Sequence, residues 1–428
     1  MIGTGYVGLV SGACFADLGN TVYCVDKNKE KIDMLNSGEI PIFEPGLNEI
    51  VRKNYIANRL KFTNDISNAV KHSDIIFICV GTPTSKKNKS ANLSFVFNAT
   101  KEIRKNINKF KIIVTKSTVP VGTGDKIEKI ILMKKKRKLF EVISNPEFLR
   151  EGEAIRDFKY PDRIVVGSNN KKATKKMEFL YKPLINKGAT FFSTKRRGAE
   201  MIKYASNAFL ATKIAYINEM ANLCEKTGIN VEEVSLGMGQ DKRIGGRFLR
   251  AGPAFGGSCF PKDINAITVT GDEFNTDLSI IKSVIKSNNK RRILLVKKVI
   301  KILKNKVKNK KIAVLGVTFK ANTDDMRESS SLIMIPFLHK KGAKIKYYDP
   351  SGEKKYFKKF KNVSFCENTK EACKNVDLII IHTEWDEFKT IDFKKITKSK
   401  KIKIYDMRNL YSHPKMKRLG LDYYSIGR

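Results

Sequence analysis

The 428 residues suffice for two or three domains, and no apolar run reaches the roughly 18 residues that a membrane span needs. The formal charge is +40, but the lysines are dispersed and no basic run is interleaved with aromatic residues, which argues for solvated faces and against a nucleic-acid surface. Seven cysteines without a CxxC pair and four histidines, none at metal-ligand spacing, argue against a metal site and for a cytoplasmic protein with reduced thiols.

Residues 3–8 read GTGYVG and are followed by an apolar helical pattern and a strand that ends at Asp26. This arrangement is a dinucleotide-binding fingerprint. Gly3 makes the turn, Gly5 admits the pyrophosphate to the helix N-terminus, and Gly8 lets helix and strand pack closely. Asp26 would accept hydrogen bonds from the ribose hydroxyls and repel a 2′-phosphate, so we predict NAD rather than NADP.

Only Met1 and Ile2 precede the fingerprint, where a doubly wound sheet needs its first strand. That strand is central, so its loss would leave a gap rather than a frayed edge. We therefore expect a gap in the sheet and a natural start a few residues upstream.

Strands and helices alternate through 75–84, 111–124 and 140–155, and each of these strands ends in polar residues. Ligands of open α/β sheets bind at the carboxyl ends of the strands. The polar residues at these ends are Thr82, Thr84, Thr118, Glu147 and Glu151. Each threonine has the alternative role of a helix or turn cap, and each glutamate that of a surface residue.

The longest helical pattern lies within residues 196–245, where Gly228 closes it. Lys203 and Asn207 are four residues apart and share one face of this helix. A solvated face is the alternative for the lysine.

The most informative stretch is 252–263, GPAFGGSCFPKD. Pro261 fits the first turn of a helix, so Cys259 would lie at the positive end of the helix dipole, with the charge of Lys262 nearby. Both effects favour the thiolate, which is the form that attacks carbon. The alternative is a buried structural cysteine. We predict a nucleophile.

From about residue 296 a second set of alternating strands and helices begins, and its first turn lacks GxGxxG. The predicted fold class is α/β, with two Rossmann-like doubly wound parallel-sheet domains joined by a helical central domain with a long helix. The predicted boundaries are 1–195, 196–295 and 296–428.

The whole chain resembles the UDP-glucose/GDP-mannose dehydrogenase family. The segments that carry the resemblance occur in one order and are GTGYVGLVSGACFADLG, NSGEIPIFEPGL, STVPVGT, NPEFLREGEAI, PDRIVVG, KYASNAFLATKIAYINE, GPAFGGSCFPKD and FKANTDDMRESSS. The family implies an NAD-binding first domain, a helical middle that forms a homodimer or larger homo-oligomer, and a C-terminal domain that binds the UDP part of a UDP-sugar. It also implies two successive oxidations that take the sugar C6 alcohol to an acid.

The loop GGSCFPKD looks most like the UDP-glucose branch, so we expect UDP-glucose as substrate. The N-acetyl-hexosamine branch usually has histidine where Ser258 stands, whereas the GDP-mannose branch keeps a similar loop and stays open as an alternative. A nucleic-acid-binding protein that has kept a dehydrogenase fold is a rival of another class, and the complete set of catalytic residues argues against it.

Apart from the resemblance, the side-chain chemistry of the candidate catalytic residues is suited to two successive oxidations. Lys203, Asn207 and Asp263 can hold a water or the alkoxide between them as base and oxyanion stabilisers. Cys259 would attack the aldehyde to form a thiohemiacetal, and loss of the second hydride would leave a thioester.

The resemblance implies the remaining roles. Glu147 would activate the water that hydrolyses the thioester, and Thr118 would help to place that water. Glu151 would contact the cofactor near the nicotinamide, and Arg327 the cofactor pyrophosphate. The expected cofactor-binding residues are Gly3, Gly5, Tyr6, Val7, Gly8, Asp26, Lys31, Thr82, Thr84, Thr118, Glu151, Lys262 and Arg327. The expected UDP-sugar-binding residues are Glu147, Phe148, Leu149, Arg150, Lys203, Asn207, Arg243, Arg250, Phe255, Gly256, Lys320 and Arg408.

Overall fold

The computed structural model describes residues 1–85, 90–397 and 402–428. The chain folds into two compact units. The first comprises Met1–Ser206 and Asn265–Asp277, and the second comprises Asn207–Ile264 and Leu278–Arg428. In the described ranges, no helix combines the length and the apolar character that crossing a membrane requires.

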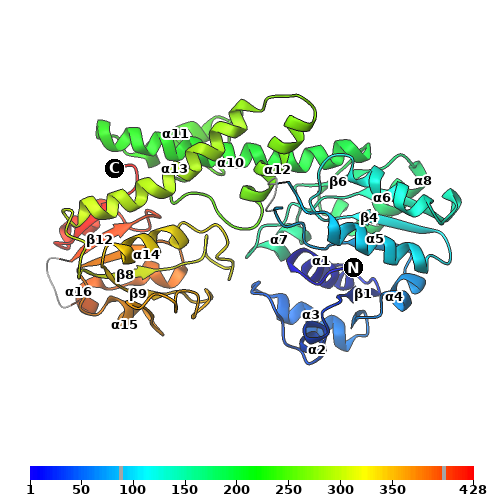
Figure 1. Cartoon of the computed structure of the whole chain (residues 1–428), viewed down its shortest axis with the longest axis horizontal. Coiled ribbons are helices and arrows are strands. Elements are labelled where there is room, and N and C mark those ends of the chain that lie inside the picture. The colour runs from blue at the N-terminus through cyan, green and yellow to red at the C-terminus, as the bar shows by residue number, and fades with distance from the viewer. Residues whose placement is uncertain (86–89, 398–401) are drawn as a thin grey trace. The chain divides into compact units, whose positions relative to one another are not determined.

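The first unit is a sheet with helices between its strands (Figure 1). Its elements in chain order are α1 (Tyr6–Asp17), β1 (Val22–Val25), α2 (Lys29–Asn36), α3 (Leu47–Ile56), β2 (Leu60–Thr63), α4 (Ile66–His72), β3 (Ile75–Ile78), α5 (Ser94–Asn106), β4 (Lys111–Thr115), α6 (Thr123–Leu132), the 3-10 turn η1 (Arg137–Leu139), β5 (Phe140–Ser144), α7 (Ala154–Lys159), β6 (Arg163–Gly167), α8 (Lys171–Leu180), α9 (Lys182–Ile185) and β7 (Thr190–Thr194). Strands β3 to β7 pair in sequence order, and β1 pairs with β2. The pairing is parallel, as predicted, with one antiparallel contact where Ser144 of β5 meets Gly167 of β6.

The first residues of the chain join the two groups of strands. Ile2 pairs in parallel with Val25 of β1 and with Ile78 of β3. The Ile2 amide donates to the Phe77 carbonyl at 2.8 Å, and on the other side the Val25 amide donates to the Met1 carbonyl at 2.8 Å. At the position of the expected gap there is thus no full strand: β1–β2 and β3–β7 form two groups, and the isolated bridges of Ile2 join them.

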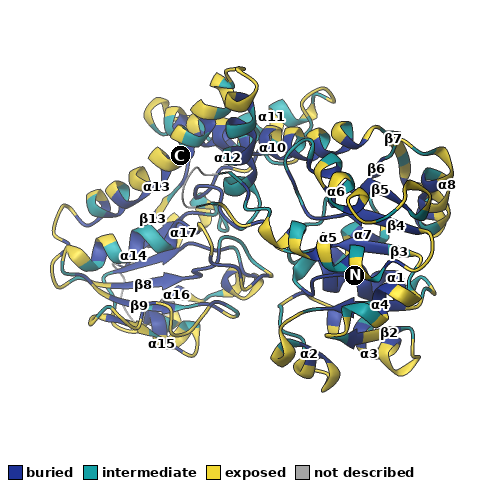
Figure 2. Ribbon diagram, turned by 45° about the vertical axis from the view of Figure 1, so that its right-hand side comes forward, coloured by how far each residue is buried: buried dark blue, intermediate teal, exposed yellow. Residues whose placement is uncertain are grey.

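Helices cover both faces of this sheet, and β4 and β5 are buried along their whole length (Figure 2). Val114 of β4 packs with Phe15 of α1 on one face. Its neighbour Ile113 packs with Ile127 of α6 on the other face. A strand buried on both faces between helices is the doubly wound arrangement that the sequence predicts.

The second unit contains a sheet of six parallel strands in the order β10-β9-β8-β11-β12-β13 (Figure 1). Its elements are the larger part of α10 (Arg196–Thr227), α11 (Val231–Gln240), the start of α12 (Phe260–Glu273), α13 (Ser279–Ile302), β8 (Lys311–Leu315), α14 (Ser331–Lys340), β9 (Lys344–Tyr348), β10 (Val363–Phe365), α15 (Thr369–Cys373), β11 (Leu378–Ile381), the 3-10 turn η2 (Asp386–Thr390), α16 (Phe393–Thr397), β12 (Lys403–Asp406), α17 (His413–Arg418) and β13 (Asp422–Ser425). Val314 of β8 packs with α13 and α14, whereas Leu315 packs with α15 and α17, so this sheet is also covered on both faces.

The long helix α10 has 32 residues and ends where the sequence predicts. Gly228 follows it with φ of +73°, a left-handed conformation that glycine adopts without strain. The helix carries both Lys203 and Asn207, one turn apart.

Candidate active site

The GTGYVG turn has the close packing that the fingerprint predicts. Gly3 has φ of +99°, and a Cβ at Gly8 would lie 1.9 Å from the Gly3 carbonyl oxygen, so neither position tolerates a side chain. At Gly5 a Cβ would meet nothing within 4 Å. Gly5 is the N-cap residue of α1, and open space beside the first amides of a helix suits the approach of an anionic pyrophosphate. Tyr6 and Val7 form the first turn of this helix.

Asp26 lies at the carboxyl end of β1 and is fixed by hydrogen bonds. Its Oδ2 accepts from the amide and the hydroxyl of Thr4, both at 2.9 Å, and its Oδ1 accepts from the Asn28 amide at 3.1 Å. Burial raises the pKa of Asp26, but these hydrogen bonds and the charge of Lys31 outweigh it and hold the pKa below its usual value. An ionised carboxylate at this edge can accept from ribose hydroxyls and repels a phosphate.

Glu147 and Lys203 form a buried ion pair in the first unit. The Lys203 Nζ lies 3.2 Å from Glu147 Oε1, and each side chain is 5% exposed. The other Glu147 oxygen accepts from the Leu149 amide at 2.5 Å. The Phe148 ring lies against the Lys203 ammonium at 5.1 Å and the Arg163 guanidinium at 4.1 Å. A carboxylate and an ammonium held together in a dry site are placed to exchange protons with a substrate or a water.

The predicted threonines lie on loops that follow β3 and β4. The Thr82 hydroxyl donates to the Thr118 carbonyl at 3.0 Å, so Thr82 holds the loop that carries Thr118. Thr118 itself is half-buried. Thr84 is exposed and forms an isolated bridge with Ala91.

Glu44, a residue that no sequence pattern marked as functional, holds the loop that follows Glu147. Its carboxylate accepts from the Gly152 amide at 2.6 Å and the Ala154 amide at 2.7 Å, and it bonds the Tyr6 hydroxyl. Glu44 therefore joins the dinucleotide turn to the catalytic loop. Only its place in the segment NSGEIPIFEPGL could have drawn attention to it, because Tyr6 lies 38 residues before it and Gly152 and Ala154 lie 108 and 110 residues after it.

Cys259 is the residue immediately before α12, as predicted. Of the seven cysteines, all within the described ranges, Cys259 alone is partly exposed. Its carbonyl accepts from the Asp263 amide at 2.8 Å in the first turn of the helix, and its Sγ lies 3.6 Å from the Ser258 hydroxyl. By contrast, burial raises the pKa of Cys14 to about 12. Partial exposure at a helix start is what the prediction of a nucleophilic Cys259 requires.

Asn207 and Asp263 are buried beside this cysteine loop in the second unit. Asn207 Nδ2 donates to Asp263 Oδ2 at 2.6 Å, and the Lys262 ammonium bonds the other carboxylate oxygen. The expected effect of Lys262 on the thiol is thus weakened, because the adjacent carboxylate offsets its charge. Of the predicted set Lys203, Asn207 and Asp263, the last two are hydrogen-bonded to each other, whereas Lys203 pairs with Glu147.

The glycine pair before Cys259 packs against the C-terminal part of the second unit. Gly257 has φ of +78°, and its amide donates to the Arg327 carbonyl at 2.8 Å. A Cβ at Gly257 would lie 2.8 Å from the Phe319 ring, and one at Gly256 would lie 2.6 Å from the Glu328 carbonyl oxygen. The segment FKANTDDMRESSS therefore supports the cysteine loop directly.

Two of the arginines predicted to bind the UDP-sugar meet in the second unit. The Arg250 guanidinium donates to the Arg408 carbonyl at 2.8 Å, and the Arg408 guanidinium pairs with Glu384 at 2.7 Å. Arg243 instead is exposed and bonds Asp241, and in the described residues no hydrogen bond or ion pair joins it to another predicted site residue. The structure thus groups Arg250 with Arg408 and leaves Arg243 outside that group.

The other predicted residues have local contacts. Arg150 pairs with Asp157 at 2.6 Å, and Arg327 pairs with Asp325 at 2.8 Å. The Lys320 ammonium lies 5.7 Å from the Phe319 ring, and Phe255 is buried. Across the described ranges, His, Cys, Asp and Glu side chains do not gather into a group that could hold a metal ion.

A dinucleotide turn, together with a thiol at a helix start, is what an enzyme requires to oxidise an alcohol and then its aldehyde through a thioester. The chain is a dehydrogenase of this class. It belongs to the UDP-glucose/GDP-mannose dehydrogenase family: residues 1–185 match the family's NAD binding domain, 197–290 its central domain and 313–413 its UDP binding domain. The cofactor is NAD.

Individual relatives match along the whole chain. The UDP-glucose 6-dehydrogenase of Rhizobium meliloti (strain 1021) is 47% identical over 432 aligned positions, which cover 100% of this chain and 99% of that protein. The structure of a UDP-glucose dehydrogenase from Pyrobaculum islandicum aligns with a TM-score of 0.90 at 33% identity, over 99% of this chain and 96% of that one. A UDP-D-ManNAc dehydrogenase from Pyrococcus horikoshii aligns with a TM-score of 0.87 at 26% identity, over 100% and 98%.

Proposed function

We propose that this chain oxidises UDP-glucose at C6 to UDP-glucuronate in two NAD-dependent steps. The observation that carries the proposal is Cys259, a partly exposed thiol at the start of α12 in a chain that matches UDP-glucose 6-dehydrogenases from end to end. A single alcohol oxidation would need no thiol nucleophile. Ser258, where the N-acetyl-hexosamine branch usually has histidine, favours UDP-glucose over those sugars.

The proposed residue roles follow the order of the reaction. NAD supplies the acceptor for each of the two hydrides. In the first oxidation, Lys203, Asn207 and Asp263 hold a water or the alkoxide between them, as base and oxyanion stabilisers. The Cys259 thiolate then adds to the aldehyde, and the thiohemiacetal gives up the second hydride to become a thioester. Glu147 removes a proton from the water that cleaves the thioester and releases the acid.

One assay tests this function. The protein is mixed with NAD and UDP-glucose, GDP-mannose or a UDP-N-acetyl-hexosamine, and NADH is followed by absorbance. We expect two NADH per UDP-glucuronate and at least a roughly 100-fold preference in kcat/KM for UDP-glucose. A preference for GDP-mannose would contradict the substrate. Duplex binding that falls steeply with salt, without NADH from any sugar nucleotide, would point to the nucleic-acid class instead.

We also propose that two copies of the chain associate through α10. Phe209, Tyr216 and Leu223 are 66%, 46% and 55% exposed and are spaced seven residues apart. Seven-residue spacing puts the three apolar side chains on one stripe of the helix, and such a stripe is suited to another helix of the same kind.

The proposed domain division is 1–195 for NAD, 196–295 for the central helices and the cysteine loop, and 296–428 for the UDP-sugar. The proposed location is the cytoplasm, because the cysteines of the chain are free and the cytoplasm keeps thiols reduced.

A further inference from the structure

Glu200 is a buried carboxylate on α10, three residues before Lys203. Its side chain accepts hydrogen bonds from the Gly122 amide at 2.7 Å, the Gly124 amide at 2.8 Å and the Ser144 hydroxyl at 3.0 Å. The residue is only 3% exposed. Burial raises the pKa of Glu200 above its usual value, although the two amides act in the opposite direction. A carboxylate placed in this way must keep its hydrogen bonds, because losing them would leave a polar group unpaired in a dry site.

The three partners of Glu200 belong to the two loops that carry the proposed catalytic groups. Gly122 and Gly124 close the loop that contains Thr118 and form the N-terminus of α6. Ser144 is the last residue of β5, three residues before Glu147. One side chain thus binds both loops to the helix that carries Lys203.

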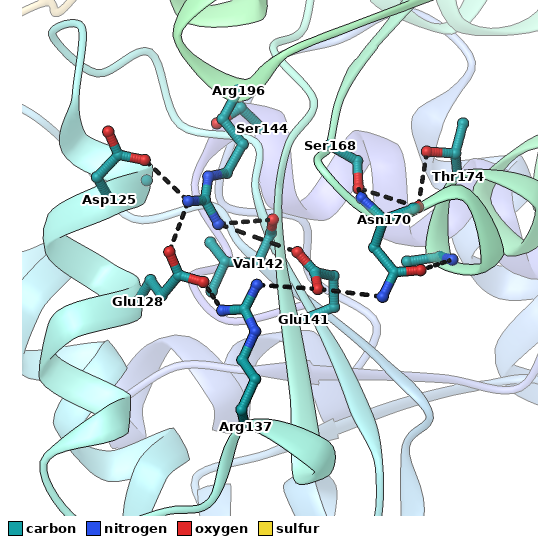
Figure 3. Close-up of polar contacts among 12 residues, drawn as sticks. Asp125, Glu128, Arg137, Glu141, Val142, Ser144, Ser168, Asn170, Thr174 and Arg196 are labelled. Carbon is teal, nitrogen blue, oxygen red and sulfur yellow. Dashed lines mark hydrogen bonds and ion pairs between the residues drawn. The ribbon is translucent and has the colours of Figure 1, made fainter.

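Arg196 anchors the preceding turn of α10 to the same helix. Its Nη2 lies 2.9 Å from Asp125 and 2.6 Å from Glu128, both on α6, and Figure 3 shows the guanidinium between these two acids. Arg196 and Glu200 are four residues apart and therefore share a face of α10. With two anchors on one face, α10 can neither rotate nor slide against α6 without breaking buried hydrogen bonds.

We infer that Glu200 is a positioning residue that holds Lys203 in place against Glu147 and the Thr118 loop. The inference rests on the proposed function, because it assigns Glu200 to the reaction of those groups. Lys203 Nζ meets Glu147 Oε1 at 3.2 Å, and this distance depends on where α10 lies relative to the end of β5. A misplacement of about 1 Å can cost on the order of 100-fold in rate.

A purely structural role would have a different consequence. It would lower the fraction of folded, active molecules and leave each active site as fast as before. A positioning role lowers the rate of each active site, because Lys203 is no longer held within hydrogen-bond distance of Glu147.

The test compares two variants with a control from the same helix. Glu200→Gln keeps the shape of the side chain but replaces one carboxylate oxygen with an NH2 group. That group cannot accept a hydrogen bond from the backbone amide that it faces. Ser144→Ala removes one of the three hydrogen bonds and little else. Arg197→Gln is the control and changes the residue that follows Arg196 on α10. The exposed Arg197 side chain pairs with Asp125 at 2.7 Å and does not bond Glu200.

Active sites are counted by the stoichiometry of NAD binding to the folded protein, and kcat for NADH release from UDP-glucose is expressed per active site. We expect kcat per active site to fall about 10-fold to 100-fold for Glu200→Gln and a few fold for Ser144→Ala, and to stay at the wild-type value for Arg197→Gln. A crystal structure of Glu200→Gln should show Lys203 Nζ out of hydrogen-bond distance of Glu147.

Wild-type kcat per active site in Glu200→Gln would overturn the inference, whatever happens to its melting temperature. If that variant does not fold, wild-type kcat in Ser144→Ala would overturn it. If the wild-type protein itself releases no NADH from UDP-glucose, the proposed function fails. The distance between Lys203 and Glu147 in the variant crystal structure then still decides the positioning role.

Discussion

At the scale of single residues, the proposed reaction divides between a thiol and a carboxylate with different surroundings. Cys259 is partly exposed at a helix start, where the dipole favours the thiolate. Glu147 is buried against an ammonium and is held by the amide of its own loop. The thiol is suited to bond formation and the carboxylate to proton transfer, so replacing each should stop the reaction at a different point.

Cys259→Ser should bind NAD and UDP-glucose but make essentially no UDP-glucuronate, because a neutral hydroxyl is a far poorer nucleophile than a thiolate. We expect slow formation of the aldehyde at best. Chromatographic analysis of the products checks this outcome. Appreciable acid formation by the serine variant would show that the second oxidation does not pass through this residue.

Glu147→Gln should stall after both hydride transfers, because it keeps the thiol but cannot deprotonate the hydrolytic water. We expect a burst of up to two NADH per site and a mass increase of one UDP-glucuronyl group on the protein. Intact-mass spectrometry measures the adduct. Glutamine can still accept a hydrogen bond from Lys203, so the fold should survive. A burst from a chain that remains unmodified would contradict the assigned role.

Asp26 should enforce the choice of NAD. Its ionised carboxylate meets a 2′-phosphate with like charge, which we expect to lower kcat/KM for NADP by about 100-fold or more. Asp26→Asn should reduce that discrimination, since it removes the charge and keeps the shape. Steady-state kinetics with both cofactors provides the measurement. Equal use of NADP by the wild-type protein would refute the assignment.

At the scale of elements, two glycines of the dinucleotide turn should affect different properties: Gly8 the stability of the fold and Gly5 the binding of NAD. Gly8→Ala should lower the melting temperature markedly, because the added Cβ would lie 1.9 Å from the Gly3 carbonyl oxygen. Gly5→Ala should leave the melting temperature unchanged without cofactor, because nothing lies within 4 Å of its Cβ, yet it should weaken NAD binding. Thermal unfolding with and without NAD separates the two effects. Unchanged NAD affinity in Gly5→Ala would remove Gly5 from the cofactor site.

His382, the residue that follows β11, should make the free energy of unfolding of the second unit fall at acidic pH. His382 is buried there, bonded to Ser330 at 2.8 Å and Thr383 at 3.1 Å, and burial together with the positive charge of Arg408 holds its pKa at about 3. Below its ordinary pKa of 6.5, the unfolded chain takes up a proton that the folded chain does not. Stability is therefore fully present above 6.5 and falls as the pH drops toward 3.

Wild-type protein should lose up to about 1.4 kcal/mol of unfolding free energy per pH unit through this residue, and His382→Gln should lack that component. Urea unfolding at pH 7, 6 and 5, followed for both proteins, tests the difference. The same dependence on pH in both proteins would mean that His382 does not control it.

At the scale of the whole molecule, the exposed stripe on α10 predicts the oligomeric state. The wild-type chain should sediment as a dimer or larger, and the double variant Phe209→Glu with Leu223→Glu should sediment as a monomer, since charges cannot be buried in an apolar interface. Phe179→Glu is the matched control, because Phe179 is 81% exposed on α8 and lies outside the stripe. A monomeric wild-type protein, or a dimeric double variant, would contradict the proposal.

Local signals in the sequence determined the dinucleotide turn, the end of α10 at Gly228 and the start of α12 after Cys259. Each signal lies within a few residues, because a left-handed glycine or a first-turn proline acts on its own segment of backbone. Alternating apolar strands and helices likewise indicated sheets covered on both faces.

Tertiary structure alone decided which side chains hold these segments in place. Glu200 bonds Gly122, which is 78 residues away in the sequence, Glu44 bonds Gly152, which is 108 residues away, and Ile2 makes the bridges that join two groups of strands. No local pattern marks a carboxylate as the partner of a distant amide. The pairing exists only after helices and strands have packed, because packing is what removes water from both groups and makes them satisfy each other.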